Sequence, residues 1–107
     1  MFVLKKVSSY KWPVEVSLPV DGGKFAKQTF TAVFRKMSRS AFNNLIDEGD
    51  DALVAEIVES WEGIQDEHGD ELVCNDQNRE MLFDDPYVMR AVIQAYTDSI
   101  TGAAEKN

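Results

Sequence analysis

The chain contains few of the residues from which covalent, metal-bound or catalytic sites are built. Its 107 residues include one cysteine, Cys74, and one histidine, His68. A single cysteine excludes an internal disulfide and fits a reducing cytoplasm. A zinc site is not expected, because neither a second histidine nor a cysteine lies at ligand spacing from His68. One histidine and one cysteine also do not supply a nucleophile with its base and oxyanion donors, so we expect a protein that is not an enzyme.

Long apolar runs are equally scarce. No stretch approaches the ~18 apolar residues that a membrane span requires, so we expect no membrane partner. The first six residues have their charges, Lys5 and Lys6, after a very short apolar run, and no signal peptide is expected from that order.

The charge that is present is distributed unevenly. Residues 1–40 hold eight Lys/Arg against two Asp/Glu, whereas residues 41–107 hold three against seventeen, and the net charge is −8. The acidic total argues against a nucleic-acid partner, although the basic first third leaves that alternative open. A small chain with one basic and one acidic part can attract copies of itself or a partner with a complementary face. The charge pattern therefore indicates a protein that works by binding.

Length and composition predict one domain, residues 1–107, because 44% hydrophobic and 10% aromatic residues suffice for a core. We expect a basic lead-in at residues 1–11, a β-hairpin at 12–37, a helical part at 38–102 and a tail at 103–107.

The hairpin is predicted from a period of two. In the first strand the apolar side chains share one face: Trp12, Val14, Val16, Leu18 and Val20. Pro13 and Pro19 cannot donate a ladder hydrogen bond, so this strand should lie at an edge of the sheet. Residues 21–23 (DGG) predict the turn. The second strand runs from Phe25 to Met37 and places Phe30, Ala32 and Phe34 on its apolar face.

Four helices are expected after Met37, with N-caps at Ser38, at Asp50 or Asp51, at Asn75 and at Asp85, which precedes a proline. The second helix is predicted to end at Gly63, since a stripe at helical spacing consists of Leu53, Val54, Ile57, Val58 and Trp61. The last helix is predicted to carry one stripe that consists of Val88, Val92, Ala95, Tyr96 and Ser99. A short third piece of sheet is expected at residues 72–74. The predicted fold class is α+β: a small antiparallel sheet, formed by the N-terminal hairpin, packed against about four helices.

No cofactor or metal is expected. The acidic turn at residues 66–71 departs from a calcium loop because His68 stands at its third position. The carboxylate pairs at residues 47–48, 50–51 and 84–85 lie at helix ends, where capping explains them better than acid–base catalysis. Gly22 and Gly23 lack the third glycine and the Lys-Ser/Thr ending of a phosphate-binding loop.

Five residues are candidates for docking a partner. Arg35, Lys36 and Arg39 cluster where the second strand meets the first helix, and they would either guard an open strand or bind an acidic partner. Trp61 ends a helical stripe, which favours a core position over a contact position. Trp12, at the start of a strand, is open to either interpretation.

Four stretches together resemble the small tail assembly chaperones of long-tailed (siphovirus-type) bacteriophages. They are residues 12–16 (WPVEV) with 19–23 (PVDGG); 30–35 (FTAVFR); 58–64 (VESWEGI) with 66–69 (DEHG); and 78–82 (NREML) with 86–88 (PYV) and 91–96 (AVIQAY). They span most of residues 12–97 and consist of strand, turn and helix chemistry, with no reactive signature.

The resemblance implies a non-catalytic protein of the bacterial host cytoplasm that keeps the tape measure protein soluble while tail tube subunits polymerise around it. Many members are made in two lengths by ribosomal frameshifting, and the family has no catalytic residues to transfer. The charge distribution adds the hypothesis of a head-to-tail homo-oligomer, in which the basic hairpin of one copy meets the acidic helices of the next. Two alternatives stay open: a structural virion component, such as a tail completion or head–tail connector protein, and a small acidic inhibitory or regulatory protein.

Overall fold

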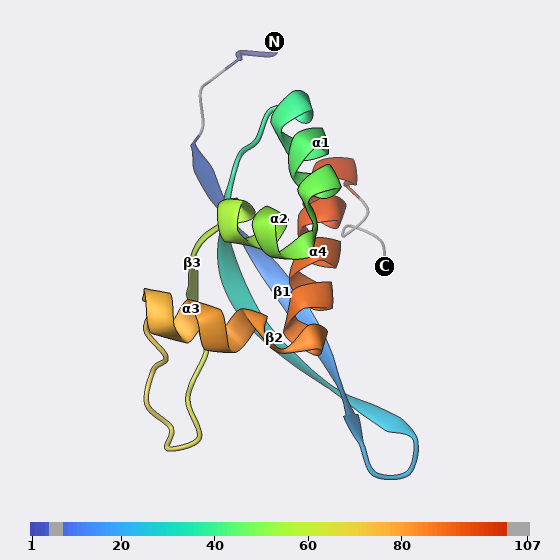
Figure 1. Ribbon diagram of the computed structural model, residues 1–107, viewed down its shortest axis with the longest axis vertical. Helices are drawn as coiled ribbons and strands as arrows, with labels where there is room; N and C mark the ends of the chain where they lie inside the picture. The colour runs from blue at the N-terminus through green and yellow to red at the C-terminus, as the bar shows by residue number, and fades with distance from the viewer. Residues whose placement is uncertain (5–7, 103–107) are drawn as a thin grey trace.

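A three-stranded antiparallel sheet carries four helices on one face (Figure 1). The computed structural model describes residues 1–4 and 8–102. Its elements are β1 (Ser9–Val20), β2 (Lys24–Arg35), α1 (Arg39–Glu48), α2 (Asp50–Ile57), β3 (Val58–Glu62), α3 (Asp76–Phe83) and α4 (Pro86–Thr101). The strand order is β1-β2-β3. The α+β class, with an N-terminal hairpin and four helices, is confirmed; the expected tail at 103–107 lies outside the described residues.

The hairpin is longer at its start than predicted. β1 and β2 pair from Ser9↔Arg35 to Val20↔Lys24, so residues 9–11 belong to the strand and not to a lead-in. The predicted alternation is confirmed at the middle of β1, where Val14 and Val16 are buried, whereas Val20 near the turn is exposed. The turn end of the hairpin extends beyond the helices that cover the rest of the sheet (Figure 1).

β1 is an edge strand, as its prolines predicted. The Lys36 N–H donates to Ser8 O at 3.0 Å and continues the β1–β2 register. Hydrogen-bonded pairs alternate in an antiparallel ladder, so the odd-numbered β1 residues direct their backbone groups to the free edge. Pro13 and Pro19 are both odd-numbered. The two residues that lack an N–H therefore sit where no partner strand within the sheet needs one.

The predicted long second helix is wrong, because the chain changes from helix to strand at Val58. A β-bulge explains the misleading pattern. Val58 opposes Phe34 and Ser60 opposes Val33, which leaves Glu59 as an extra residue. In a regular strand Val58 and Trp61 would face opposite sides, but the bulge turns both into the core. Their spacing of three then matches a helical stripe.

Two further predictions near this segment are wrong. The third strand is β3, while residues 72–74 form no strand and lie beyond an isolated bridge between Gln65 and Glu71. Neither Asp50 nor Asp51 caps α2; Gly49 does so with a φ of 114°, and it also ends α1. A positive φ suits glycine, and the two aspartates lie in the first turn of α2, where their charge complements the helix dipole.

The other three caps are confirmed. Ser38 Oγ accepts from Ala41 N–H at 3.2 Å, Asn75 Oδ1 from Asn78 N–H at 2.8 Å, and Asp85 Oδ1 from Tyr87 N–H at 2.8 Å.

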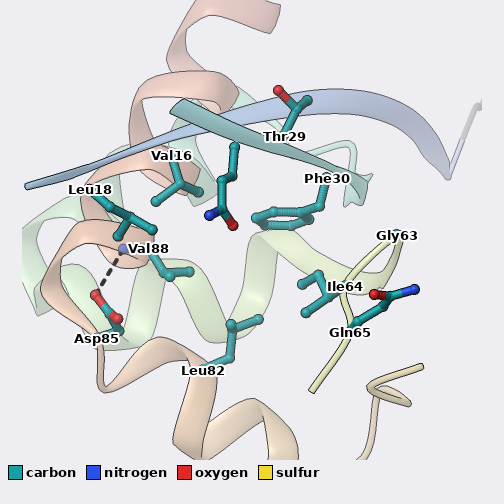
Figure 2. A pocket seen from close by; sticks show the side chains of 11 residues that line it. Val16, Leu18, Thr29, Phe30, Gly63, Ile64, Gln65, Leu82, Asp85 and Val88 are labelled. Carbon is teal, nitrogen blue, oxygen red and sulfur yellow. Dashed lines mark hydrogen bonds between the residues drawn. The ribbon is translucent and has the colours of Figure 1, made fainter. Parts of the chain in front are cut away.

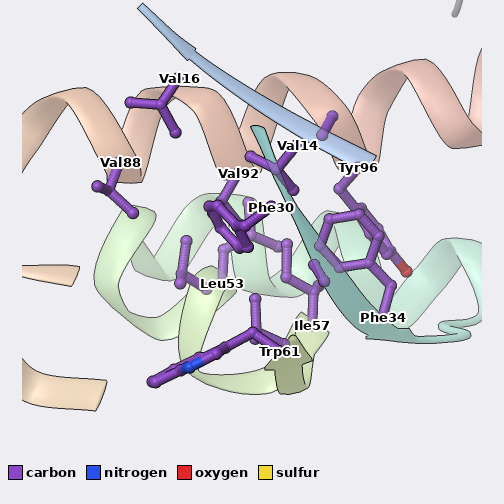
Figure 3. Packing of buried hydrophobic residues seen from close by; sticks show 14 residues of the cluster. Val14, Val16, Phe30, Phe34, Leu53, Ile57, Trp61, Val88, Val92 and Tyr96 are labelled. Atoms are coloured by element: carbon purple, nitrogen blue, oxygen red, sulfur yellow. The ribbon is translucent and has the colours of Figure 1, made fainter. Parts of the chain in front are cut away.

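The core lies between the sheet and α2 and α4 (Figure 3). From the sheet it receives Val14, Val16, Phe30, Ala32, Phe34, Val58 and Trp61. From the helices it receives Leu53, Val54, Ile57, Val88, Val92, Ala95 and Tyr96. The predicted apolar stripe of α4 is thus confirmed, and the opposite face of the sheet is mostly polar, with Phe25 and Val33 as apolar side chains of β2 on it.

Candidate protein-binding surfaces

The five candidate docking residues do not form one surface. Arg35 is the last residue of β2. Its Nη1 lies 3.8 Å from Glu56 Oε2 and its Nε lies 3.9 Å from Glu59 Oε1, so its charge is balanced within the chain. Lys36 and Arg39 follow it and are exposed. In the described part of the chain neither of these two side chains forms an ion pair. The basic cluster therefore offers two free cations at the junction of β2 and α1.

Trp61 is buried, with 6% of its surface exposed, which removes it from the candidate contact residues. Its Nε1–H donates to Leu72 O at 2.7 Å, and its ring stands edge-on to Phe83 at 5.9 Å. A buried indole usually finds such a partner for its N–H. The indole holds the segment after the 66–70 turn against β3, and Cys74 also faces this strand, with Sγ 3.9 Å from Glu59 O.

Trp12 is half-buried on β1 and stands edge-on to Tyr10 at 6.4 Å. It is one wall of a groove between β1 and α4. The groove consists of two hollows of about 360 and 300 Å³ that share Glu15, Ala91 and Gln94. We call it the edge groove and define it by Trp12, Glu15, Phe25, Tyr87, Ala91 and Gln94.

Aromatic side chains line both ends of the edge groove, and a small residue lines its middle. Trp12 lies at one end, while Phe25 from the hairpin and Tyr87 from α4 lie at the other. Phe25 is 65% exposed and Tyr87 is 38% exposed. Ala91 in the middle leaves room for a partner's backbone to approach α4. Exposed aromatic side chains are typical of surfaces that bind another polypeptide.

A second hollow of about 190 Å³ opens between the hairpin, the segment after β3 and the helices α3 and α4 (Figure 2). We call it the apolar cleft and define it by its apolar side chains: Val16, Leu18, Phe30, Ile64, Leu82 and Val88. Gln28, Thr29 and Gln65 also line it. The N-cap Asp85 stands at its border and accepts from Val88 N–H at 3.4 Å.

The acidic turn is held by its own side chain. Asp66 Oδ1 accepts from His68 N–H at 2.9 Å and from Asp70 N–H at 3.0 Å. Within residues 1–4 and 8–102, no three His, Cys, Asp or Glu side chains are placed to hold a metal ion. No helix in these residues has the length and apolar character to cross a membrane.

No protein-family model matches the chain, and no curated protein or solved structure shows significant similarity to it. The edge groove and the apolar cleft are therefore identified from the structure of this chain alone.

One residue of the edge groove carries a signal that sequence reasoning missed. Phe25 lies on the mostly polar face of β2, which it shares with Lys27, Thr29, Thr31 and the partly buried Val33, and it is exposed there. An apolar side chain on a polar face is a candidate contact. The apolar cleft has no such signal, because its residues come from four separate segments and meet only in the folded chain.

Proposed function

We propose that the protein is a non-catalytic chaperone of phage tail assembly, which binds an apolar segment of the tape measure protein in its edge groove. The observation that carries the proposal is the exposure of Phe25 and Tyr87 at one end of this groove. The identity of the client comes from the family resemblance of the sequence.

The dimensions of the groove suit a helix. From Trp12 to Pro19, the residue opposite Phe25, the strand advances by seven residues, which at ~3.3 Å each is about 23 Å. A helix of about 15 residues has that length. Its apolar face would cover the aromatic side chains, as in helix-in-groove recognition. Glu15, Arg90 and Gln94 line the same hollow and supply polar contacts at the border.

Shielding of this kind needs no nucleotide. The client's apolar surface is covered while it is bound, and tail tube subunits release the chaperone by competing for the client. The protein would act in the cytoplasm of the bacterial host and be absent from the finished particle.

Co-expression with the tape measure protein of the same genome tests the proposal. The variant F25S/Y87S removes both exposed aromatic side chains from the groove. Met81→Ser is the matched control, since Met81 is 59% exposed but lies on α3, away from the groove. Loss of two aromatic anchors costs about 2 kcal/mol or more, so binding should weaken about 30-fold.

We expect the client to stay soluble with the wild type and with Met81→Ser, and to precipitate with F25S/Y87S. A client that stays soluble with F25S/Y87S would overturn the groove assignment. Recovery of the protein in purified particles would favour a structural virion component, and capture of a basic host protein alone would favour an inhibitory role.

A further inference from the structure

The segment Met1–Leu4 leaves four consecutive apolar side chains uncovered. Met1 is fully exposed, and the exposed fractions are 83% for Phe2, 62% for Val3 and 79% for Leu4. Single exposed apolar residues are ordinary, but a contiguous exposed apolar run marks an interaction site. Nothing in the described part of the chain packs against this run.

The apolar cleft has the size and lining to receive one of these side chains. A dry apolar cavity of about 150 Å³ holds a benzene ring, and the cleft measures about 190 Å³. Leu18, Ile64 and Leu82 are only partly buried around it, so filling the cleft would remove further apolar surface from water.

The charges around the cleft complement the residues that follow the apolar run. The cleft adjoins a hollow with which it shares Ile64 and Gln65. The ionisable residues lining the two hollows, among those described, are all carboxylates: Asp85, Asp66 and Glu71. In the sequence, Lys5 and Lys6 come directly after Leu4. The order of an apolar run followed by two cations therefore complements an apolar cleft with an acidic border.

The segment Met1–Leu4 does not fill the cleft of its own chain in this structure, since all four of its side chains are exposed. The labelled N end in Figure 1 also lies far from α3, which borders the cleft.

We propose that the apolar cleft binds the segment Met1–Leu4 of a second copy of this chain, with the Phe2 ring inside the cleft. The contact joins unlike surfaces, so each copy offers one segment and one cleft, and repetition joins copies head to tail. The inference stands apart from the proposed client binding, because different side chains define the apolar cleft and the edge groove.

Sedimentation velocity of two complementary variants tests the contact. F2S/L4S keeps the cleft but loses the apolar segment, whereas Leu82→Glu keeps the segment but places a charge in the cleft. Removing either half should raise the dissociation constant more than tenfold, because the burial of apolar side chains is lost. Ile46→Ser is the control, since Ile46 is exposed on α1 outside both surfaces.

We expect the wild type and Ile46→Ser to associate, each of the two variants to be monomeric alone, and their equimolar mixture to form a dimer and nothing larger. A monomeric wild type, or an F2S/L4S variant that associates like the wild type, would overturn the proposal. If Leu82→Glu fails to fold, Ile64→Glu replaces it in the mixture. The outcome leaves client binding to be judged separately, because F2S/L4S retains the whole edge groove.

Discussion

Phe34 joins the sheet to α4 through aromatic contacts. It is fully buried, and its ring stands edge-on to Tyr10 at 6.1 Å and to Tyr96 at 5.0 Å. Phe34→Ala should lower the free energy of unfolding by about 3–5 kcal/mol, because it removes these contacts and leaves a cavity. Urea denaturation measures this loss.

Phe25→Ala is the control on the same strand. Phe25 is 65% exposed, so the change should alter the free energy of unfolding by no more than about 0.5 kcal/mol. Equal losses for the two variants would contradict the assignment of Phe34 to the core and Phe25 to a binding surface.

Tyr96 should make stability depend on alkaline pH. Its hydroxyl donates to Arg35 O at 2.9 Å. Burial, with a smaller contribution from Tyr10, raises the pKa of Tyr96 from 10.0 to about 12. The native state therefore keeps this proton at a pH where the unfolded state loses it. The stability contributed by the neutral phenol is present below pH 10 and is lost as the pH rises toward 12.

Tyr96→Phe removes this titration, so the variant should lose less stability than the wild type between pH 10 and pH 12. At neutral pH it should be less stable by about 1 kcal/mol, because the hydrogen bond is absent. Urea denaturation across this pH range measures both effects, with Tyr87→Phe on the exposed part of α4 as control. If the free energy of unfolding falls equally with pH for the wild type and for Tyr96→Phe, the loss of stability at alkaline pH arises from other groups.

At the scale of elements, α4 depends on its first cap. Asp85 Oδ1 accepts from Tyr87 N–H and Val88 N–H, while its neighbour Asp84 ends α3. Asp85→Ala should lower the free energy of unfolding by about 1 kcal/mol, since two helical N–H groups lose their acceptor. Asp84→Ala makes the same charge change without removing this cap and should cost less than about 0.5 kcal/mol. Thermal unfolding of both variants distinguishes the cap from the charge.

The prolines of β1 should protect its free edge. P13T/P19T places N–H groups at two odd-numbered positions that direct their backbone away from β2. An edge with a complete row of donors is a template for pairing with another chain. We expect faster growth of thioflavin-positive aggregates than for the wild type, and no such change for Pro86→Ala at the start of α4. Unchanged aggregation would show that the prolines do not guard the edge.

Local chemistry predicted the hairpin, three of the helix caps and the apolar face of α4, because each depends on residues close in sequence. β3 could not be predicted in this way. The bulge at Glu59 gave Val58 and Trp61 a helical spacing, and only pairing with β2 makes the segment a strand. Tertiary pairing here overrides a pattern that is ambiguous over five residues.

At the scale of the whole molecule, the uneven charge is partly balanced within one chain. Lys11 pairs with Glu62 at 2.8 Å, and Arg35 lies near Glu56 and Glu59, so the basic hairpin contacts the acidic segment that follows α1. These pairs are exposed, and each contributes little to stability. Among the residues that the structure describes, no carboxylate pairs with Lys36 or Arg39, which leaves both cations available to an acidic surface. Charge counts along the sequence could not distinguish the paired cations from Lys36 and Arg39, because the pairing depends on the fold.

The central proposal, that a segment of the tape measure protein binds in the edge groove, is tested most directly by hydrogen–deuterium exchange of the protein with and without that proposed client. The side chains of Glu15 and Ser17 line the groove, and the amides of these two residues point to the free edge of β1. These amides have no partner strand, so they should exchange quickly in the protein without a bound segment. We predict that a bound tape measure segment slows exchange at these two amides and leaves the 66–70 turn unchanged. Slowed exchange at the 66–70 turn, with the edge of β1 unaffected, would contradict the account.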